Sequence, residues 1–329
     1  MRALVVVSPG QPPVVDTRPE PTSGPGTTLV RLTAAPVVPL DLLCASGTSY
    51  FGAPATPYVP GVQGVGVVEA SAAHLVGSRV FVSTTAGMAP GDGAHAERVV
   101  VPDGAVTPLP TSDAPDGSPD DATVAALGLS AVAAWACLVL RARLAAGEHV
   151  LVLGAGGAVG QAALGAARSL GAARVVAGCR PGTAADRARA AGADVVVDTT
   201  GPVGEVAARL AEACGGRLDV VVDPVWGAPA EAALAAISPG GRLVNLGSAA
   251  GETATLGSAL LRSRSAVVLG HTNNALSASE RDEGLRAMLD LAGRGEVRVA
   301  HEVVPLAEGP RAWAAVGDGT AGSRVVLAP

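Results

Sequence analysis

The sequence predicts a two-domain α/β protein in which a doubly wound parallel sheet follows an all-β, partly open barrel. The chain of 329 residues is long enough for two domains of ordinary size. Residues 1–110 contain short β-branched runs separated by Pro and Gly, which is typical of a barrel. From residue 146 onward, apolar strands alternate with helices, as a parallel sheet requires.

The first domain begins with a short apolar run after Met1 that is broken at Ser8-Pro9-Gly10. This run is too short for a secretory signal, so we predict a first strand and a cytoplasmic protein. Further strands are predicted for the β-branched runs 28–32, 64–69, 79–83 and 97–101. The polar segment 111–121 is rich in turn formers and is predicted to be the boundary between the domains.

The second domain begins with an uncharged run from Val124 to Leu140. This run falls just short of the roughly 18 residues of a spanning helix, so we predict a buried core helix and no membrane span. Beyond it, strands are predicted at 150–153, 174–177, 195–197, 219–222, 242–246 and 266–269, and helices at 160–170, 184–191, 204–213 and 229–237. Because these strands are too apolar for a sheet with one solvent-exposed face, we expect helices on both faces of the sheet.

Composition excludes several function classes. A net charge of −6, a pI near 5.4 and an aromatic content of 2% argue against nucleic acid as a partner, which leaves a small-molecule substrate. All 23 basic residues are arginine, so lysine nucleophiles are excluded. The four cysteines are widely spaced, which predicts neither disulfides nor a thiolate metal cluster.

A glycine-rich turn joins the strand 150–153 to the helix that follows. In a Rossmann domain, such a turn lets the backbone approach a pyrophosphate, and the helix N-terminus offers unpaired N–H groups. The alternative is a glycine turn without a ligand, but a strand before it and a helix after it favour dinucleotide binding. The predicted cofactor-binding residues of this turn are Gly154, Gly156, Gly157, Ala158, Val159 and Gly160.

The end of the second strand indicates which dinucleotide is bound. An acidic residue about 20 residues after the glycines holds the ribose of NAD, whereas an arginine there accommodates the 2′-phosphate of NADP. Here Cys179 and Arg180 follow the strand, and the first acid is Asp186. We therefore predict NADPH as the cofactor, with an ordinary surface arginine as the alternative reading of Arg180.

Several segments resemble the medium-chain dehydrogenase/reductase superfamily over nearly the whole chain, specifically its zinc-independent quinone oxidoreductase and enoyl reductase branch. Residues 57–69 resemble the family's P-G-x-E-G-x-G-x-V segment, and 239–248 its fifth-strand turn. Leu127 to Trp135 and Leu144 to Gly154 resemble its entry helix and first Rossmann strand. Cys179-Arg180-Pro181 is similar to the Ser-Arg-Pro of NADP-dependent members.

The resemblance implies a GroES-like substrate domain over residues 1–118, completed by 276–329, and a Rossmann domain over 119–275. It also implies a homodimer formed through the edge of the Rossmann sheet. Gly247 and Ser248 would contact the cofactor. So would Arg324, where the family more often has Lys in its returning strand.

The metal positions of the zinc-dependent relatives are not kept. Val37 lies near the position of one cysteine ligand, Val62-Gln63 replaces a His-Glu pair, and the five histidines are scattered. We therefore expect no metal site. The family's Asn-Pro-x-Asp turn reads Val38-Pro39-Leu40-Asp41, and Ala133 replaces a frequent Thr, so the predicted substrate site is apolar.

Tyr50 is the remaining candidate catalytic residue, since Gly47-Thr48-Ser49-Tyr50 lies close to the family's Gly-x-Tyr. Its phenol would hydrogen-bond a carbonyl or supply a proton, or else only line a pocket. The predicted function is zinc-independent, NADPH-dependent hydride transfer to a quinone or an α,β-unsaturated carbonyl. The alternatives are a dinucleotide-binding protein without turnover, and a biosynthetic carbonyl or imine reductase or dehydrogenase of the same fold.

Overall fold

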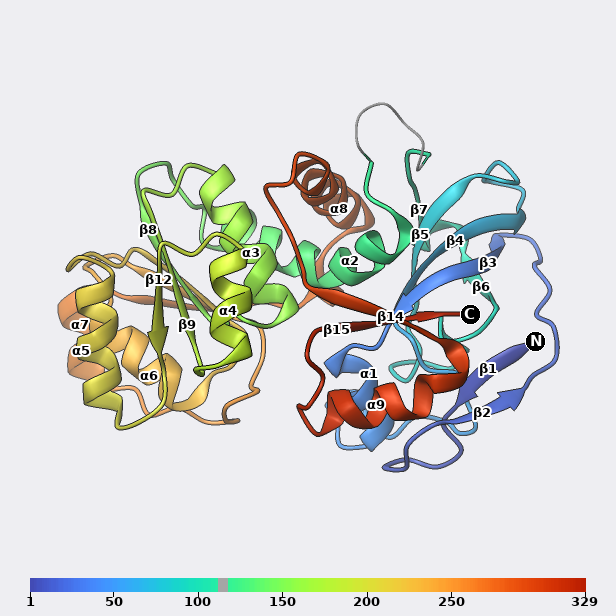
Figure 1. Ribbon diagram of the computed structural model, residues 1–329, viewed down its shortest axis with the longest axis horizontal. Helices are drawn as coiled ribbons and strands as arrows, with labels where there is room; N and C mark the ends of the chain where they lie inside the picture. The colour runs from blue at the N-terminus through green and yellow to red at the C-terminus, as the bar shows by residue number, and fades with distance from the viewer. Residues whose placement is uncertain (112–117) are drawn as a thin grey trace. The chain divides into compact units, whose positions relative to one another are not determined.

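The computed structural model describes residues 1–111 and 118–329 of the chain (Figure 1). These residues group into one unit made of Met1–Gly128 and Ala300–Pro329, and a second made of Leu129–Val299. The predicted boundary segment 111–121 lies mostly outside the described residues. Residues 276–299, assigned from sequence to the first domain, belong to the second unit, because helix α8 (Ala278–Gly293) packs on α3 and Gly284 contacts Trp135.

The second unit is built on a six-stranded sheet in the order β10-β9-β8-β11-β12-β13, with every neighbouring pair parallel. Its strands are β8 (His149–Leu153), β9 (Arg174–Cys179), β10 (Val195–Asp198), β11 (Val220–Asp223), β12 (Arg242–Asn245) and β13 (Val267–Gly270). This is the doubly wound order of two mononucleotide-binding halves. The strand order reverses next to β8, which makes the carboxyl ends of β8 and its neighbours the place for a ligand.

Helices cover both faces of this sheet, as the apolar strands predict. In Figure 1, α3 (Ala158–Ser169) and α4 (Thr183–Ala190) lie on one side, and α5 (Val203–Ala213) and α6 (Gly227–Ala236) on the other. The core on the α5 and α6 side is aliphatic and includes the fully buried Leu151, Leu153, Leu210, Leu234 and Leu243. Helix α7 (Ser258–Arg264), which has no counterpart in the sequence prediction, precedes the edge strand β13.

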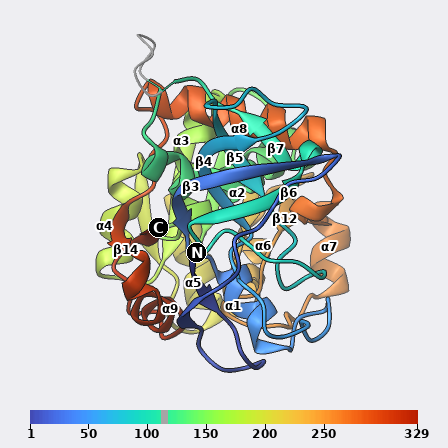
Figure 2. The ribbon, with the colours of Figure 1, turned by 90° about the vertical axis from the view of Figure 1, so that its right-hand side faces the viewer.

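The first unit holds a seven-stranded sheet in the order β14-β15-β3-β4-β5-β7, with β6 also paired to β3 (Figure 2). Its strands are β3 (Thr27–Pro36), β4 (Gln63–Ala70), β5 (Arg79–Ser83), β6 (Arg98–Pro102), β7 (Val106–Pro108), β14 (His301–Pro305) and β15 (Arg324–Ala328). A separate ribbon pairs β1 (Arg2–Val5) with β2 (Val14–Thr17). Register shifts between β3 and β4 bend the sheet, as a partly open barrel requires.

Two helices complete the first unit, and their positions follow from local sequence. Helix α1 (Pro39–Ser46) begins with Pro at its first position and ends at Gly47, which has a φ of 77°. Helix α9 (Gly309–Gly317) buries Trp313 against Leu4, Val37 and Leu327 in the core of this unit. The last strand, β15, lies beside β3, so the end of the described chain returns to the first unit.

Helix α2 (Asp121–Trp135) is the apolar helix that the sequence predicts, and it continues into a π-helical segment, Ala136–Arg141. Residues 121–141 pass the length and hydropathy criteria for a membrane span, but 72% of their most apolar window is buried, which fits a core helix. The helix is kinked at Gly128, whose φ of 32° and ψ of −132° are not helical. A Cβ there would lie 2.5 Å from Gln63 Oε1, and Gln63 Nε2 donates to the Ala125 carbonyl at 3.1 Å.

Candidate cofactor-binding site

The glycine turn lies at the carboxyl end of β8, between β8 and α3. Gly154 has a φ of 57°, and its carbonyl accepts a hydrogen bond from Gly157 N at 2.9 Å. Gly157 is the N-cap residue of α3, and no side chain caps this end of the helix. The first N–H groups of a helix have no partner within the helix, and an anion is a partner that a helix N-terminus favours.

Close packing explains three of the glycines. A Cβ on Gly154 would lie 2.7 Å from Val225 Cγ1, and one on Gly160 would lie 2.5 Å from Ala155 Cα. A Cβ on Gly156 would lie 2.6 Å from Ala184 Cα, in the first turn of α4. The turn is therefore tightly fitted to the first turn of α4 and to the loop after β11. Gly157 is different, because its Cβ would meet only the Gly154 carbonyl oxygen, at 3.3 Å.

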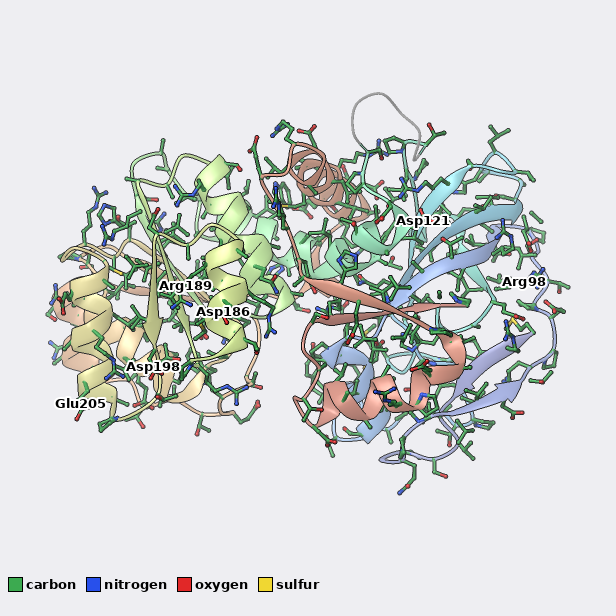
Figure 3. The ribbon with its side chains drawn as sticks, in the orientation of Figure 1. Arg98, Asp121, Asp186, Arg189, Asp198 and Glu205 are labelled. Atoms are coloured by element: carbon green, nitrogen blue, oxygen red, sulfur yellow. The ribbon has the colours of Figure 1, made fainter. Side chains whose placement is uncertain are left out.

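The end of β9 carries no acidic residue. Cys179 is 5% exposed, and burial raises the pKa of its thiol, so it is an uncharged group at the strand end. Arg180 follows it and is exposed. The first acid, Asp186, is in α4 and pairs with Arg189 at 2.9 Å (Figure 3).

One acidic residue near this strand end is not among the site residues predicted from sequence. Asp198 ends β10 and is the register partner of Cys179, so it lies at the carboxyl end of the sheet, beside the strand end predicted to meet the ribose. It accepts hydrogen bonds from the backbone N and the hydroxyl of Thr200, both at 2.8 Å. These bonds lower the pKa of Asp198 and hold its charge on the Thr200 side. Its signal in the sequence is its position directly after a predicted strand.

A second polar network that sequence reasoning missed fixes the ends of β11 and β12. Asp223 is fully buried and accepts hydrogen bonds from Val225 N and Trp226 N at 3.0 and 2.8 Å. Asn245 Nδ2 donates to Asp223 Oδ2 at 3.1 Å and to the Gly247 carbonyl at 2.8 Å. Burial raises the pKa of Asp223, despite these hydrogen bonds. The network holds the loop that contains Gly247 and Ser248 against the turn after β11.

Of the predicted site residues, Tyr50 and Arg324 lie in the first unit. The Tyr50 side chain is 77% exposed, and its ring lies 4.2 Å from that of Phe51, centroid to centroid. Arg324 Nη1 donates to the Val37 carbonyl at 3.1 Å, and burial lowers the pKa of Arg324 to about 10. The glycine turn, Cys179, Arg180 and Gly247 thus lie at the carboxyl ends of the strands of the second unit. Arg324 lies in the first unit, beside the loop before α1.

Asp41 organises that loop in the first unit. Its carboxylate is buried and accepts the N–H groups of Val38 and Val62, each at 2.9 Å. His95 Nε2 lies 3.8 Å from the same carboxylate and donates to the Pro36 carbonyl at 3.0 Å. Burial raises the pKa of Asp41. The carboxylate therefore ties together the two loops that carry Val38 and Val62-Gln63.

These loops do not offer a metal site. Among the residues that the structure describes, no three His, Cys, Asp or Glu side chains are placed to hold an ion. Val38 and Val62 present no ligand atoms, and the Gln63 amide is engaged by the Ala125 carbonyl. The donor set of a zinc-dependent dehydrogenase is therefore missing from this part of the chain.

Comparisons with known proteins match both units. Residues 24–111 match the model described as alcohol dehydrogenase GroES-like domain, and residues 158–292 match the zinc-binding dehydrogenase model. The quinone oxidoreductase of Homo sapiens is 36% identical over 179 residues, which is 52% of this chain and 50% of that protein. The chain therefore spans about half the length of the curated relatives that it matches.

Solved structures match over the whole chain. The quinone oxidoreductase from Thermus thermophilus, solved also in complex with NADPH, is 32% identical with a TM-score of 0.81, and 100% of both chains is covered. A mycobacterial quinone oxidoreductase is 26% identical with a TM-score of 0.86, again with full coverage of both chains.

Proposed function

Because the chain belongs to the medium-chain dehydrogenase/reductase superfamily, in its quinone oxidoreductase-like branch, we propose that it is an NADPH-dependent reductase of quinones or α,β-unsaturated carbonyls. The observation that carries the proposal lies at the carboxyl ends of the parallel strands of the second unit. There a glycine turn leads into a helix whose N-cap residue has no capping side chain, and Arg180 stands where NAD-binding domains have an acid. The turn and the first N–H groups of α3 would bind the pyrophosphate, and Arg180 the 2′-phosphate.

The proposed residue roles divide between the two units. Gly154, Gly156, Gly157, Gly160, Gly247 and Ser248 would let the backbone approach the dinucleotide, and Cys179 would lie beside its ribose. Arg324, by the family resemblance, would contact the cofactor. The bound NADPH would supply the hydride. The chain would contribute orientation and the exclusion of water, and Tyr50 a proton.

The choice of acceptor follows from the side chains of the first unit. Val38 and Val62 present no polar side-chain atom, and Gln63 Nε2 already donates to the Ala125 carbonyl. These three residues therefore offer little to stabilise the alkoxide that forms when an unactivated ketone accepts hydride. A conjugated acceptor delocalises that charge, so it needs less help from the protein. We expect activity with quinones and enones and little with simple ketones.

The test is NADPH oxidation by the purified protein with a panel of quinones and enones, followed by the absorbance of NADPH. A simple ketone and a secondary alcohol with NADP⁺ serve as matched comparisons. Turnover of conjugated acceptors alone supports the proposal. Robust turnover of the secondary alcohol with no enone or quinone activity contradicts it.

A second candidate, dinucleotide binding without turnover, is favoured by Val38 and Ala133, which replace polar neighbours of the reaction in the family. It would be accepted if NADPH binds but no acceptor in the panel is reduced. A biosynthetic carbonyl or imine reductase would be indicated by turnover of those substrates instead.

Preference for NADPH over NADH is tested by titrating both cofactors. One charge-assisted phosphate contact contributes about 1.5–3 kcal/mol, which is roughly ten- to a hundredfold in affinity. We expect Arg180→Ala to remove most of the difference. Equal affinity of the parent protein for NADPH and NADH would contradict the assignment.

We also propose a cytoplasmic homodimer formed through β13. This strand is the edge of the sheet, and Val267 and Val268 on it are 40% and 38% exposed. An exposed apolar edge strand is a template for pairing with another copy. Sedimentation velocity of the parent protein and of Val268→Arg should show a dimer and a monomer, respectively, and a monomeric parent would contradict this.

A further inference from the structure

Arg187 joins the glycine turn to α4. In a helix the side chains tilt toward the N-terminus, so a residue in the second turn covers the first. Arg187 follows this rule, and its Nε donates to the Gly156 carbonyl at 2.8 Å. The same carbonyl accepts from Gln161 Nε2 at 3.0 Å. The guanidinium group therefore lies where the turn after β8 meets the first turn of α4.

This junction is also close to the end of β9. Burial raises the pKa of the Cys179 thiol, and the charges that act on this thiol are those of Arg189, Asp198 and Arg187, of which Asp198 raises the pKa and the two arginines lower it. In a Rossmann domain, the adenosine ribose lies between the glycine turn and the end of the second strand. Arg187 is bonded to the turn that borders this position, and the exposed Arg180 directly follows the strand that borders it.

Two acidic groups nearby have partners of their own. Asp186 pairs with Arg189, and Asp198 accepts two hydrogen bonds from Thr200 (Figure 3). The Nε of Arg187 donates to the Gly156 carbonyl, and this bond does not itself neutralise the guanidinium group, because a carbonyl oxygen has no net charge. A guanidinium group attracts a phosphate dianion far more strongly than a ribose hydroxyl.

We propose that Arg187 is a second specificity-determining residue, which contacts the 2′-phosphate of NADPH while its Nε anchors the glycine turn. This inference rests on the proposed function, because it presupposes that the second unit binds NADPH. Arg180 and Arg187 would then share the 2′-phosphate.

The test compares Kd values for NADPH and NADH in the parent protein, Arg187→Met, Arg187→Lys and Gln161→Leu. Arg187→Met keeps most of the apolar stem and removes the charge. We expect the ratio of NADH to NADPH Kd to fall by about tenfold or more. Arg187→Lys keeps the positive charge, so its ratio of NADH to NADPH Kd should lie between those of the parent protein and Arg187→Met. Gln161→Leu removes the other donor to the Gly156 carbonyl without a change of charge, so it should weaken both cofactors equally.

Arg168→Met in α3 is the control, since Arg168 is 50% exposed and pairs with Asp194 at the amino end of β10, the end opposite to Cys179. Its ratio should stay within about twofold of the parent. Competition by 2′,5′-ADP against 5′-ADP gives the same comparison without nicotinamide. An unchanged ratio in Arg187→Met, with both cofactors weakened alike or not at all, overturns the inference. A parent protein that does not prefer NADPH overturns the cofactor proposal instead, so the two failures are distinguishable.

Discussion

Gly156→Ala tests whether the glycine turn is shaped by its contact with α4. The added Cβ would lie 2.6 Å from both Cα and Cβ of Ala184 and 2.7 Å from its carbonyl oxygen. Non-bonded carbon atoms pack at about 3.5–4.0 Å, so the turn and the helix must separate by roughly 1 Å. Two of the three obstacles are backbone atoms, and a rotamer change cannot relieve them.

Separation of the turn from α4 has two measurable effects. Overpacking of this kind costs about 1–3 kcal/mol in the free energy of unfolding. The shift also lengthens the hydrogen bond from Arg187 Nε to the Gly156 carbonyl, which is 2.8 Å in the parent. It moves the peptide groups that face the phosphates, and the loss of one such hydrogen bond weakens NADPH binding by about tenfold.

Urea unfolding and an NADPH titration measure these two effects. Gly204→Ala in α5 is the matched control, because a Cβ added there would have no heavy atom within 4 Å and the residue is helical. We expect the control to bind NADPH normally and to gain up to about 1 kcal/mol from the helix propensity of alanine. A Gly156→Ala variant as stable as the parent, with equal affinity for NADPH, would show that the turn does not depend on this contact.

Three further variants test the charged and polar groups. Glu148 accepts two hydrogen bonds from the guanidinium group of Arg242, at 2.7 and 2.9 Å, and the side chains of Glu148 and Arg242 are 16% and 19% exposed. Glu148→Gln should therefore lower the free energy of unfolding, measured in urea at pH 7, by about 1.5–3 kcal/mol. Arg242 lowers the pKa of Glu148, so the stabilisation is present above the ordinary value of 4.5 and is lost as the pH falls through the folded value. The exposed pair of Glu205 and Arg209 supplies the control, and Glu205→Gln should change stability by no more than about 0.5 kcal/mol. Asp41→Asn leaves one acceptor oxygen for the N–H groups of Val38 and Val62, so it should lose about 1–3 kcal/mol at pH 5. Burial raises the pKa of Asp41 in the folded state, so the parent protein loses stability as the pH rises above 3.8. The difference in the free energy of unfolding between the parent and Asp41→Asn should therefore become smaller as the pH rises. A difference that grows with pH would contradict this. Tyr50→Phe should lower kcat with an enone by about ten- to a thousandfold if the phenol donates the proton, and an unchanged kcat would leave Tyr50 as a lining residue.

The six strands of the second unit and its helices α3 to α6 could be predicted from sequence, because the strands are mostly apolar runs and turn signals separate them from the helices. β8 and the turn at Gly154 are the clearest case, since a strand, three glycines and a helix follow one another within residues 149–169. Helix α8 is not among the predicted helices, although Ser277 and Glu280 form a capping box at its start. A serine followed three residues later by a glutamate is the signal from which this helix could have been found.

The contacts between loops could not be predicted in the same way. The Asp41 carboxylate bonds to Val62 N, and Arg187 bonds to the Gly156 carbonyl, across sequence separations that no periodic pattern encodes. Asp223 and Asn245 end two strands that are adjacent only because of the order of the sheet. Strand-end polar residues are the one sequence signal for such networks, and which of them meet depends on topology.

The kink at Gly128 couples two positions that are far apart in the sequence. Any side chain at 128 would occupy the volume of the Gln63 amide, and this amide in turn donates a hydrogen bond to the Ala125 carbonyl, one turn before the kink. A carboxylate at 63 would have no proton to donate to that carbonyl at neutral pH. We therefore expect residues 63 and 128 to covary among relatives, with glutamine accompanying glycine. A relative with a larger residue at 128 should carry a smaller one at 63.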